Sequence, residues 1–487
     1  MGTAVDSDSV QPAKTCATSG EKPKVGLLLL TAEWFTQIGA SQGSFKGLPH
    51  QLQEDAGRID EALCSELQIV NAGVIATRQQ VDEAVELFKK EKVDLVVVCQ
   101  ITWGEDRLII DSVQKLPNTP LLLWCYSPFQ SLPEQMSMRD LFRASGPVGA
   151  LQASAPLKRL GKKFGFAFGS YKNPAAIKSV VEFSRACKTA RELKNATIGV
   201  LPYRCDQMTG TYVDEFRLKK EIGPELKYIS VNEYSAICAG VPDEAVEAFV
   251  RDLKGNFRMA ESVTEAGLAK SARVSLGLAR LVEKYRLDAL ALEDVSEELH
   301  RVMGLRPCLY VPTLFERAVV SMEAEVGGAV ALMMLKKLAG KAPMYVEIFT
   351  YDEDENCLLA GHAGIHDIHL AESNDAVLLE PDGEYVESEP DSCWMRFRAK
   401  GGHVTMLSVF CDVDRFKMVI TSGECLGGKE KLLGSPHAYV KIATPLAEFF
   451  EKAIKTGMTQ HWALVHDGVV NELVVLADVL GLEKVLI

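Results

Sequence analysis

Carboxylates and an imidazole that could together bind a divalent metal occur within one stretch, from Ser321 to His362. Glu323 and Glu325 precede an apolar run, while Glu347 and His362 come after it. Carboxylate oxygens and imidazole nitrogens suit Mn²⁺, Mg²⁺, Fe²⁺ or Zn²⁺. The residue types therefore predict a metal site, provided that the fold brings these side chains together.

The apolar run at residues 326–338 is predicted to be a helix, because two lysines lie in its last turn and Gly340 can end it. Glu323 and Glu325 then stand at the start of this helix, where negative charge is favoured by the helix dipole. A carboxylate in that position more often caps a helix than binds a metal. The sequence leaves open which of the two would be a ligand.

A β-hairpin is predicted from Met344 to Ala360, around an acidic turn at residues 352–356. Because Glu347 and His362 are equally far from the centre of that turn, they would face each other and share one side of the hairpin. A strand disfavours Glu, so this charge must be solvated, paired or bound to metal. Taken singly, a solvated glutamate and a structural histidine remain the alternatives; only their combination favours a metal site.

The overall composition is that of an ordinary globular protein, with 47% apolar and 24% charged residues. A length of 487 residues predicts two to four domains. The net charge of −13 argues against nucleic acid or an anionic membrane as a partner. No apolar run approaches the roughly 20 residues of a membrane span, and the N-terminus lacks the apolar core of a signal peptide. We expect a cytosolic protein whose scattered cysteines are reduced.

Strands and helices alternate from Lys24 onward, which is typical of parallel sheets covered by helices. The predicted fold class is α/β, with two doubly wound parallel-sheet domains followed by a C-terminal antiparallel, barrel-like β domain. The predicted limits are a disordered tail at 1–22 and domains at 23–172, 173–318 and 319–487. No glycine-rich dinucleotide or P-loop motif occurs where a strand meets a helix.

Further predictions concern the first domain and the start of the helix that follows it. Trp103 follows a strand that ends near Cys99, so it should lie on the carboxyl rim, where parallel sheets bind ligands. Its ring could stack on a sugar, although a packing role is the alternative. The glycine-rich, basic segment 146–169 suits a connection between domains, and Asn173 and Pro174 are predicted to start the next helix as its N-cap and first residue.

The sequence resembles the L-fucose/L-arabinose isomerase superfamily of aldose–ketose isomerases, from about Lys24 to the C-terminus. The specific likeness lies in E-A-E at 323–325, which resembles the family's E-G-D segment before a helix, in Glu347 within a strand, in G-H at 361–362 and in Q-H-W at 460–462. More loosely, L-Q-A-S at 151–154 resembles a segment with a sugar-contacting glutamine.

The resemblance implies roles for individual residues. Glu323 and Glu347 would bind a divalent metal, Mn²⁺ or another, and serve as the acid/base pair. His461 would be a further ligand, His362 a ligand or substrate contact, and Gln152 would lie at the substrate. Family members assemble as oligomers with shared active sites, so a homo-oligomer, trimer or hexamer, is expected.

Two departures from the family concern the sugar more than the reaction. Glu325 stands where the family has Asp, and Trp462 stands where arabinose isomerases have a second histidine. The predicted function is a metal-dependent aldose–ketose isomerase that interconverts a pentose or 6-deoxyhexose with its ketose through an enediolate. A sugar-binding protein without catalysis and a metal-dependent hydrolase are the rival hypotheses, and the sequence does not say which carboxylate is the base.

Overall fold

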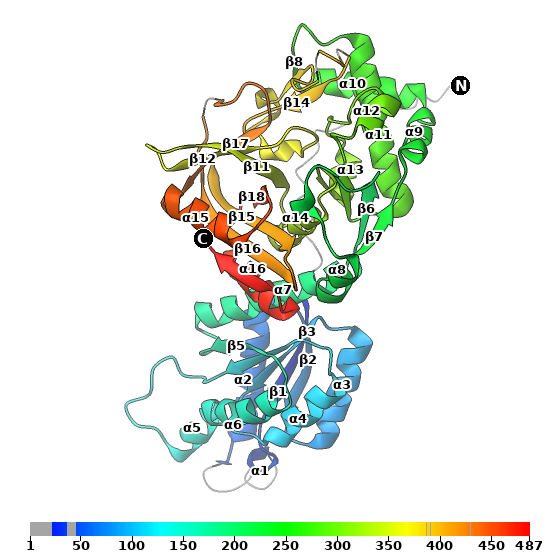
Figure 1. Cartoon of the computed structure of the whole chain (residues 1–487). Coiled ribbons are helices and arrows are strands. Elements are labelled where there is room, and N and C mark those ends of the chain that lie inside the picture. The colour runs from blue at the N-terminus through cyan, green and yellow to red at the C-terminus, as the bar shows by residue number, and fades with distance from the viewer. Residues whose placement is uncertain (1–21, 37–44, 386, 390, 429) are drawn as a thin grey trace, which may run out of the picture.

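The computed structural model describes all residues except 1–21, 37–44, 386, 390 and 429 (Figure 1). The predicted tail at 1–22 therefore lies, apart from Lys22, outside the described residues. Two of the three larger sheets are wholly parallel, and the third is antiparallel except for its last strand. This arrangement confirms the predicted fold class.

The first lobe is built on a five-stranded parallel sheet with the order β2-β1-β3-β4-β5. Helices α2 and α7 pack on one face, and α3, α4 and α6 on the other, so the valine-rich central strand β3 is buried throughout. The elements are β1 (Lys24–Leu30), α1 (Glu33–Thr36), α2 (Leu48–Cys64), β2 (Gln68–Ile75), α3 (Arg78–Glu91), β3 (Leu95–Gln100), α4 (Asp106–Lys115), β4 (Leu121–Cys125), α5 (Met138–Arg143), α6 (Gly146–Arg159), β5 (Gly165–Phe168) and α7 (Pro174–Lys194).

The prediction that residues 146–169 connect two domains is wrong, because this segment forms α6 and β5 of the first lobe. Its glycines serve close packing. A Cβ on Gly146 would lie 2.3 Å from the carbonyl oxygens of Gln100 and Tyr126. The start of α7 is as predicted, since the Asn173 side chain accepts a hydrogen bond from Ala175 N–H and Pro174 is the first helical residue.

A four-stranded parallel sheet follows, with the order β10-β9-β6-β7. Its elements are β6 (Thr197–Leu201), α8 (Glu215–Glu221), β7 (Glu225–Tyr228), α9 (Val231–Ala239), α10 (Asp243–Asn256), α11 (Glu265–Tyr285), β9 (Ala289–Leu292), α12 (Glu297–Met303), α13 (Pro312–Arg317) and β10 (Val319–Ser321). A small sheet lies beside it, made of β8 (Arg258–Met259), β13 (Leu378–Glu380) and β14 (Trp394–Arg396).

The third sheet closes on itself. Strands β15, β18, β11, β12, β17 and β16 pair in that order, and β16 pairs back to β15, with β19 added at β16. The bounds are β11 (Pro343–Asp352), β12 (Cys357–Gly361), β15 (Gly402–Cys411), β16 (Phe416–Cys425), β17 (His437–Ile442), α15 (Leu446–Thr456), β18 (His461–Val465), α16 (Val470–Leu480) and β19 (Glu483–Leu486). The ring is the barrel-like domain that the sequence predicts.

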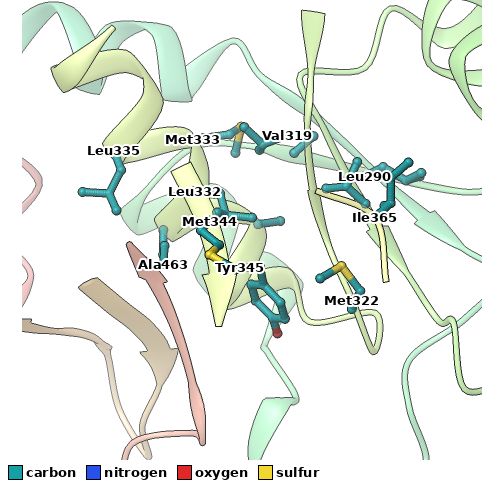
Figure 2. Packing of buried hydrophobic residues seen from close by; sticks show 14 of the residues in the cluster. Leu290, Val319, Met322, Leu332, Met333, Leu335, Met344, Tyr345, Ile365 and Ala463 are labelled. Carbon is teal, nitrogen blue, oxygen red and sulfur yellow. The ribbon is translucent and has the colours of Figure 1, made fainter. Parts of the chain in front are cut away.

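Helix α14 (Val326–Ala339) joins the second sheet to this ring. Every residue from Val326 to Leu335 is buried, because the helix contacts β9 and β10 on one side and β15 and β18 on the other. Figure 2 shows its side chains packed between Leu290 and Val319 of the parallel sheet and Met344 and Ala463 of the ring. A helix so enclosed fixes the residues at its N-terminus within the core.

The predicted hairpin exists, but its register changes halfway. Near the turn the pairs agree with the prediction, with Thr350 opposite Leu359. Phe349 is then an extra residue in β11, a β-bulge, so Glu347 faces Gly361 and not His362. The predicted pairing of Glu347 with His362 is therefore wrong by one residue.

The predicted domain limits at 172 and 318 stay predictions. Helix α7 covers the first sheet and also contacts α14 and α16, while β10 pairs with β9. A single core cluster extends from the second sheet through the ring. Among the described helices, none has the length and apolarity needed to cross a membrane.

Substituting Gly361 with Ala should destabilise the protein by about 1–3 kcal/mol, because a side chain there overpacks the bulged hairpin. The new Cβ would lie 2.3 Å from the carbonyl oxygen of Pro436 and 2.7 Å from the Phe349 ring. The matched control is Gly57→Ala in α2, where nothing lies within 4 Å and a stabilisation of about 0.5–1 kcal/mol is expected. Denaturant unfolding of metal-free protein measures both changes in stability. If Gly361→Ala changed the free energy of unfolding no differently from Gly57→Ala, the bulged register of β11 and β12 would be contradicted.

Candidate metal centre

Three buried side chains converge where the second sheet meets the ring. Ligand atoms of Glu323, His362 and His461 all lie within 4.8 Å of one another. Glu323 Oε2 is 3.0 Å from His461 Nε2, and Glu323 Oε1 is 3.7 Å from His362 Nε2. Among the described residues, Glu323 Oε2 and both histidine Nε2 atoms are buried without a hydrogen-bond partner. A divalent cation between them would satisfy all three atoms, so the group fits such an ion.

Glu323 is held at the carboxyl rim of the second sheet by an unusual backbone. Glu323 and Ala324 have φ angles of 57° and 50°, in the left-handed region. Two hydrogen bonds hold this turn: Glu323 N–H donates to Asp294 Oδ1 at 2.9 Å, and Ala324 N–H donates to the Leu292 carbonyl at 2.9 Å. Strained backbone of this kind persists where the surrounding structure enforces it, often at functional sites.

Asp294 is in turn fixed by Arg306, and both side chains are buried. Arg306 Nη1 is 3.4 Å from Asp294 Oδ2, and the same guanidinium donates to both oxygens of Asp382, at 2.7 and 3.0 Å. Burial raises the pKa of Asp294 to about 6, while the charge of Arg306 opposes this rise. The chain of contacts from Arg306 through Asp294 sets the position of the Glu323 backbone.

His461 begins strand β18 and lies between two carboxylates. Its Nδ1 is 3.1 Å from Glu325 Oε2, which also accepts a 2.7 Å hydrogen bond from the Tyr345 hydroxyl. Burial lowers the pKa of His461, but Glu323 and Glu325 outweigh it and raise this pKa to about 10. Glu325 is the N-cap residue of α14, yet its side chain makes no capping bond. The Glu325 carboxylate instead contacts Nδ1 of His461, the ring nitrogen that does not face Glu323, as carboxylates do for metal-bound histidines.

His362 follows the last residue of β12 and presents its Nε2 to the same space. Its Nδ1–H donates to the Ala363 carbonyl at 2.6 Å, so the lone pair of the neutral ring is on Nε2. Burial, and next the charge of His461, lowers the pKa of His362 well below its usual value. A neutral imidazole with a free Nε2 is the form that binds a metal.

Glu347 lies beside the three convergent residues. On the side of β11 away from the hairpin, it is the direct partner of His461 in β18, so the two side chains share a face. Glu347 is half-buried. Burial raises its pKa, the charge of His461 opposes the rise, and the charge of Glu323 adds to it. Glu347 is therefore a carboxylate that faces the site from the ring and has a raised pKa.

Glu293 is a residue of this site that the sequence analysis missed. It follows β9 directly and precedes Asp294, on the rim that also carries Glu323. Burial raises the pKa of Glu293 to about 8, and the charges of Asp294 and Glu323 contribute. An acidic pair directly after a buried parallel strand was the signal that could have identified it.

Trp103 and Gln152 are close to each other but not to this group. Trp103 Nε1–H donates to Gln152 Oε1 at 2.8 Å, and the Trp103 ring packs against Phe35 of α1. In Figure 1, α1 lies at the end of the first lobe that points away from the ring. Within one chain, the structure therefore does not bring these residues to Glu323, His362 and His461.

Comparison with known proteins relates the chain to sugar isomerases. No family model matches it. The sulfoquinovose isomerase of Priestia aryabhattai is 24% identical over 427 residues, which cover 84% of this chain and 90% of that protein. The corresponding enzyme of Priestia megaterium gives the same values. The L-arabinose isomerase of Aeromonas salmonicida is 23% identical over 324 residues, or 63% of this chain and 62% of that one.

A comparison of structures adds nothing to this relationship. A periplasmic solute binding protein from Actinobacillus succinogenes 130z with bound D-allose aligns over 66% of this chain and 85% of its own, at 12% identity. The TM-score is 0.15, too low to carry any argument about fold or ligand. The sequence alignments alone support the relationship, which is to the aldose–ketose isomerase superfamily.

Replacing Glu325 with Gln should raise the dissociation constant for Mn²⁺ about 10- to 100-fold, because the carboxylate that orients His461 is lost. Glu323→Gln should weaken binding further, since it alters one of the three convergent groups. Glu316→Gln, an exposed glutamate on α13, is the matched control and should leave the affinity unchanged. Calorimetric titration with Mn²⁺ measures all three; a Glu325→Gln protein that binds like the control would remove Glu325 from this role.

Proposed function

We infer that this chain, a relative of the sulfoquinovose and L-arabinose isomerases, is itself an aldose–ketose isomerase, and we propose that it requires a divalent metal. The observation that supports metal dependence most directly is the set of three buried, unpartnered ligand atoms on Glu323, His362 and His461. Mn²⁺ is the ion proposed, on a pentose or 6-deoxyhexose as substrate.

The proposed division of labour follows from the position of each side chain. Glu323, His362 and His461 would hold the cation, which when bound supplies positive charge against the negative charge that develops on two adjacent sugar oxygens. Isomerisation also needs a group that moves a proton between the two carbons. Glu347 is proposed for this step, because it lies opposite His461 and its raised pKa brings it closer to neutral pH.

Glu323 is the second carboxylate of the proposed acid/base pair. Its Oε1 is 3.7 Å from His362 Nε2, and its Oε2 is 3.0 Å from His461 Nε2. Glu323 would help to hold the cation and would carry the hydroxyl proton from one sugar oxygen to the other. The pair then matches the chemistry, because Glu347 would return the proton taken from one carbon to the neighbouring carbon, while Glu323 would deliver the hydroxyl proton to the carbonyl oxygen. His461 interacts electrostatically with both Glu323 and Glu347.

A homo-oligomer, trimer or hexamer, accounts for the position of Trp103 and Gln152. Their shared rim points away from the ring of its own chain (Figure 1), so they would contact the sugar only from a neighbouring subunit. We propose such a shared site in a cytosolic enzyme. The hydrogen bond between Trp103 and Gln152 would orient the amide for a sugar hydroxyl.

The test is a screen for ketose formation with chelator-stripped protein, over pentoses, 6-deoxyhexoses and sulfoquinovose. Activity should be absent without metal and restored best by Mn²⁺. His461→Ala should remain inactive after Mn²⁺ is added, whereas His403→Ala, which changes an exposed histidine elsewhere in the ring, should behave like the wild type. Full activity after chelation, with metal absence confirmed by elemental analysis, would overturn metal dependence. Binding of sugars without any conversion would favour a non-catalytic binding protein.

A further inference from the structure

Glu293 is a buried carboxyl group at this site for which the proposed reaction assigns no role. Its side chain is 3% exposed, and its Oε2 atom is enclosed without a hydrogen-bond partner among the described residues. Its own N–H donates to the Leu201 carbonyl at 2.7 Å, which ties the end of β9 to the end of β6. A carboxyl oxygen buried without a partner is costly, so a ligand that pairs with it would be favoured.

The loop that follows β6 places Glu293 beside the metal group. This loop, residues 202–208, reaches across to the ring, where Gln460 Nε2 lies 3.1 Å from Met208 Sδ, one residue before His461. The Cys205 thiol of this loop forms a hydrogen bond with the Glu293 side chain, and the charges of Asp294, Glu323 and Asp206 act on the same carboxyl group. Glu293 is therefore near both the loop and Glu323, beside the space in which the sugar of the proposed reaction would bind.

Resting on the proposed function, we propose that Glu293 is a substrate-binding residue whose free carboxyl oxygen forms a hydrogen bond with a hydroxyl group of the aldose. A hydroxyl can both donate and accept, so it pairs with a carboxyl group in either protonation state. Glu293 would thus help to position the carbon chain for proton transfer.

Other partners for Glu293 fit less well. Among the described residues, the single convergent group of metal ligands is Glu323, His362 and His461, so Glu293 has no companions for a second cation. An anionic substituent would meet the charges of Glu323 and Asp206. The nearby buried cation, Arg306, is already engaged by Asp294, Asp382 and Glu384. A neutral hydroxyl group meets neither of these objections.

The experiment compares Glu293→Leu with Glu293→Gln, using the aldose that the wild type converts best and the sugar alcohol of the same chain length and configuration. Leu removes the hydrogen bond, so KM and the dissociation constant of the sugar alcohol should rise about 10- to 100-fold. Gln keeps a polar group at the same reach and should restore both to within a few-fold. Mn²⁺ affinity should be unchanged in each. Glu297→Leu, at an exposed position in the first turn of α12, is the matched control.

Calorimetry with the sugar alcohol tests the role of Glu293 separately from the proposed isomerase activity, because it measures binding without turnover. If Glu293→Leu does not fold, Glu293→Asp replaces it; that variant withdraws the carboxyl group by one methylene and should also weaken binding. Unchanged sugar-alcohol affinity in the folded variant would overturn the role of Glu293 and leave the isomerase proposal intact. A wild type that binds the sugar alcohol but converts no aldose would instead overturn the proposed function.

Discussion

The feature on which the rest of the site depends is a set of buried ligand atoms whose polar neighbours are one another. Glu323 Oε2 and His461 Nε2 are 3.0 Å apart and attract each other, but neither of them nor His362 Nε2 has a hydrogen bond of good geometry among the described residues, and a buried polar atom left in that state costs up to about 1–3 kcal/mol. Folding brings them together only because the surrounding core is large and apolar, with α14 enclosed between the parallel sheet and the ring (Figure 2). A cation bound there would remove this cost, which supports the proposal that the group binds a metal.

Two chains of contacts hold the ligands before any metal binds. From the parallel sheet, Arg306 fixes Asp294, and Asp294 fixes the strained backbone at Glu323. From α14 and the ring, the Tyr345 hydroxyl holds the Glu325 carboxylate next to His461. Outer contacts of this kind orient metal ligands, so they would keep the three side chains in place while a substrate binds and leaves. The two chains come from different sheets, which explains why the site lies at their junction.

The local elements of this site could be predicted from the sequence, because helix 326–338 and the hairpin are encoded by short-range patterns of apolar residues, turns and charges. The register at Glu347 could not, since it depends on a bulge at Phe349 that adds one residue to the strand. The pairing of β11 with β18, which places His461 opposite Glu347, joins segments more than a hundred residues apart and has no local signal.

Another error arose because glycine occurs both in connections between domains and at positions of close packing. The glycines and basic residues of 146–169 suggested a connection between domains, but at Gly146 the absence of a side chain allows α6 to approach the sheet. The resemblance to a family identified Glu323, His362 and His461, which the structure brings together. The resemblance also selected Gln152, which lies in the first lobe beside Trp103 and whose role at the substrate stays a prediction. Glu293 was missed although it directly follows a predicted strand, because its proximity to Glu323 depends on the pairing of β9 with β10.

The central claim is that Glu347 moves a proton between two carbons of a sugar. The direct measurement is isomerisation in D₂O, with deuterium located in the ketose by NMR, for the wild type and Glu347→Gln. The wild type should incorporate deuterium at the carbon that receives the proton, because a carboxyl proton exchanges with solvent. Glu347→Gln should turn over at least about 10²-fold more slowly when Mn²⁺ is saturating. Rapid conversion by Glu347→Gln, or a wild-type ketose free of deuterium at that carbon, would contradict the account.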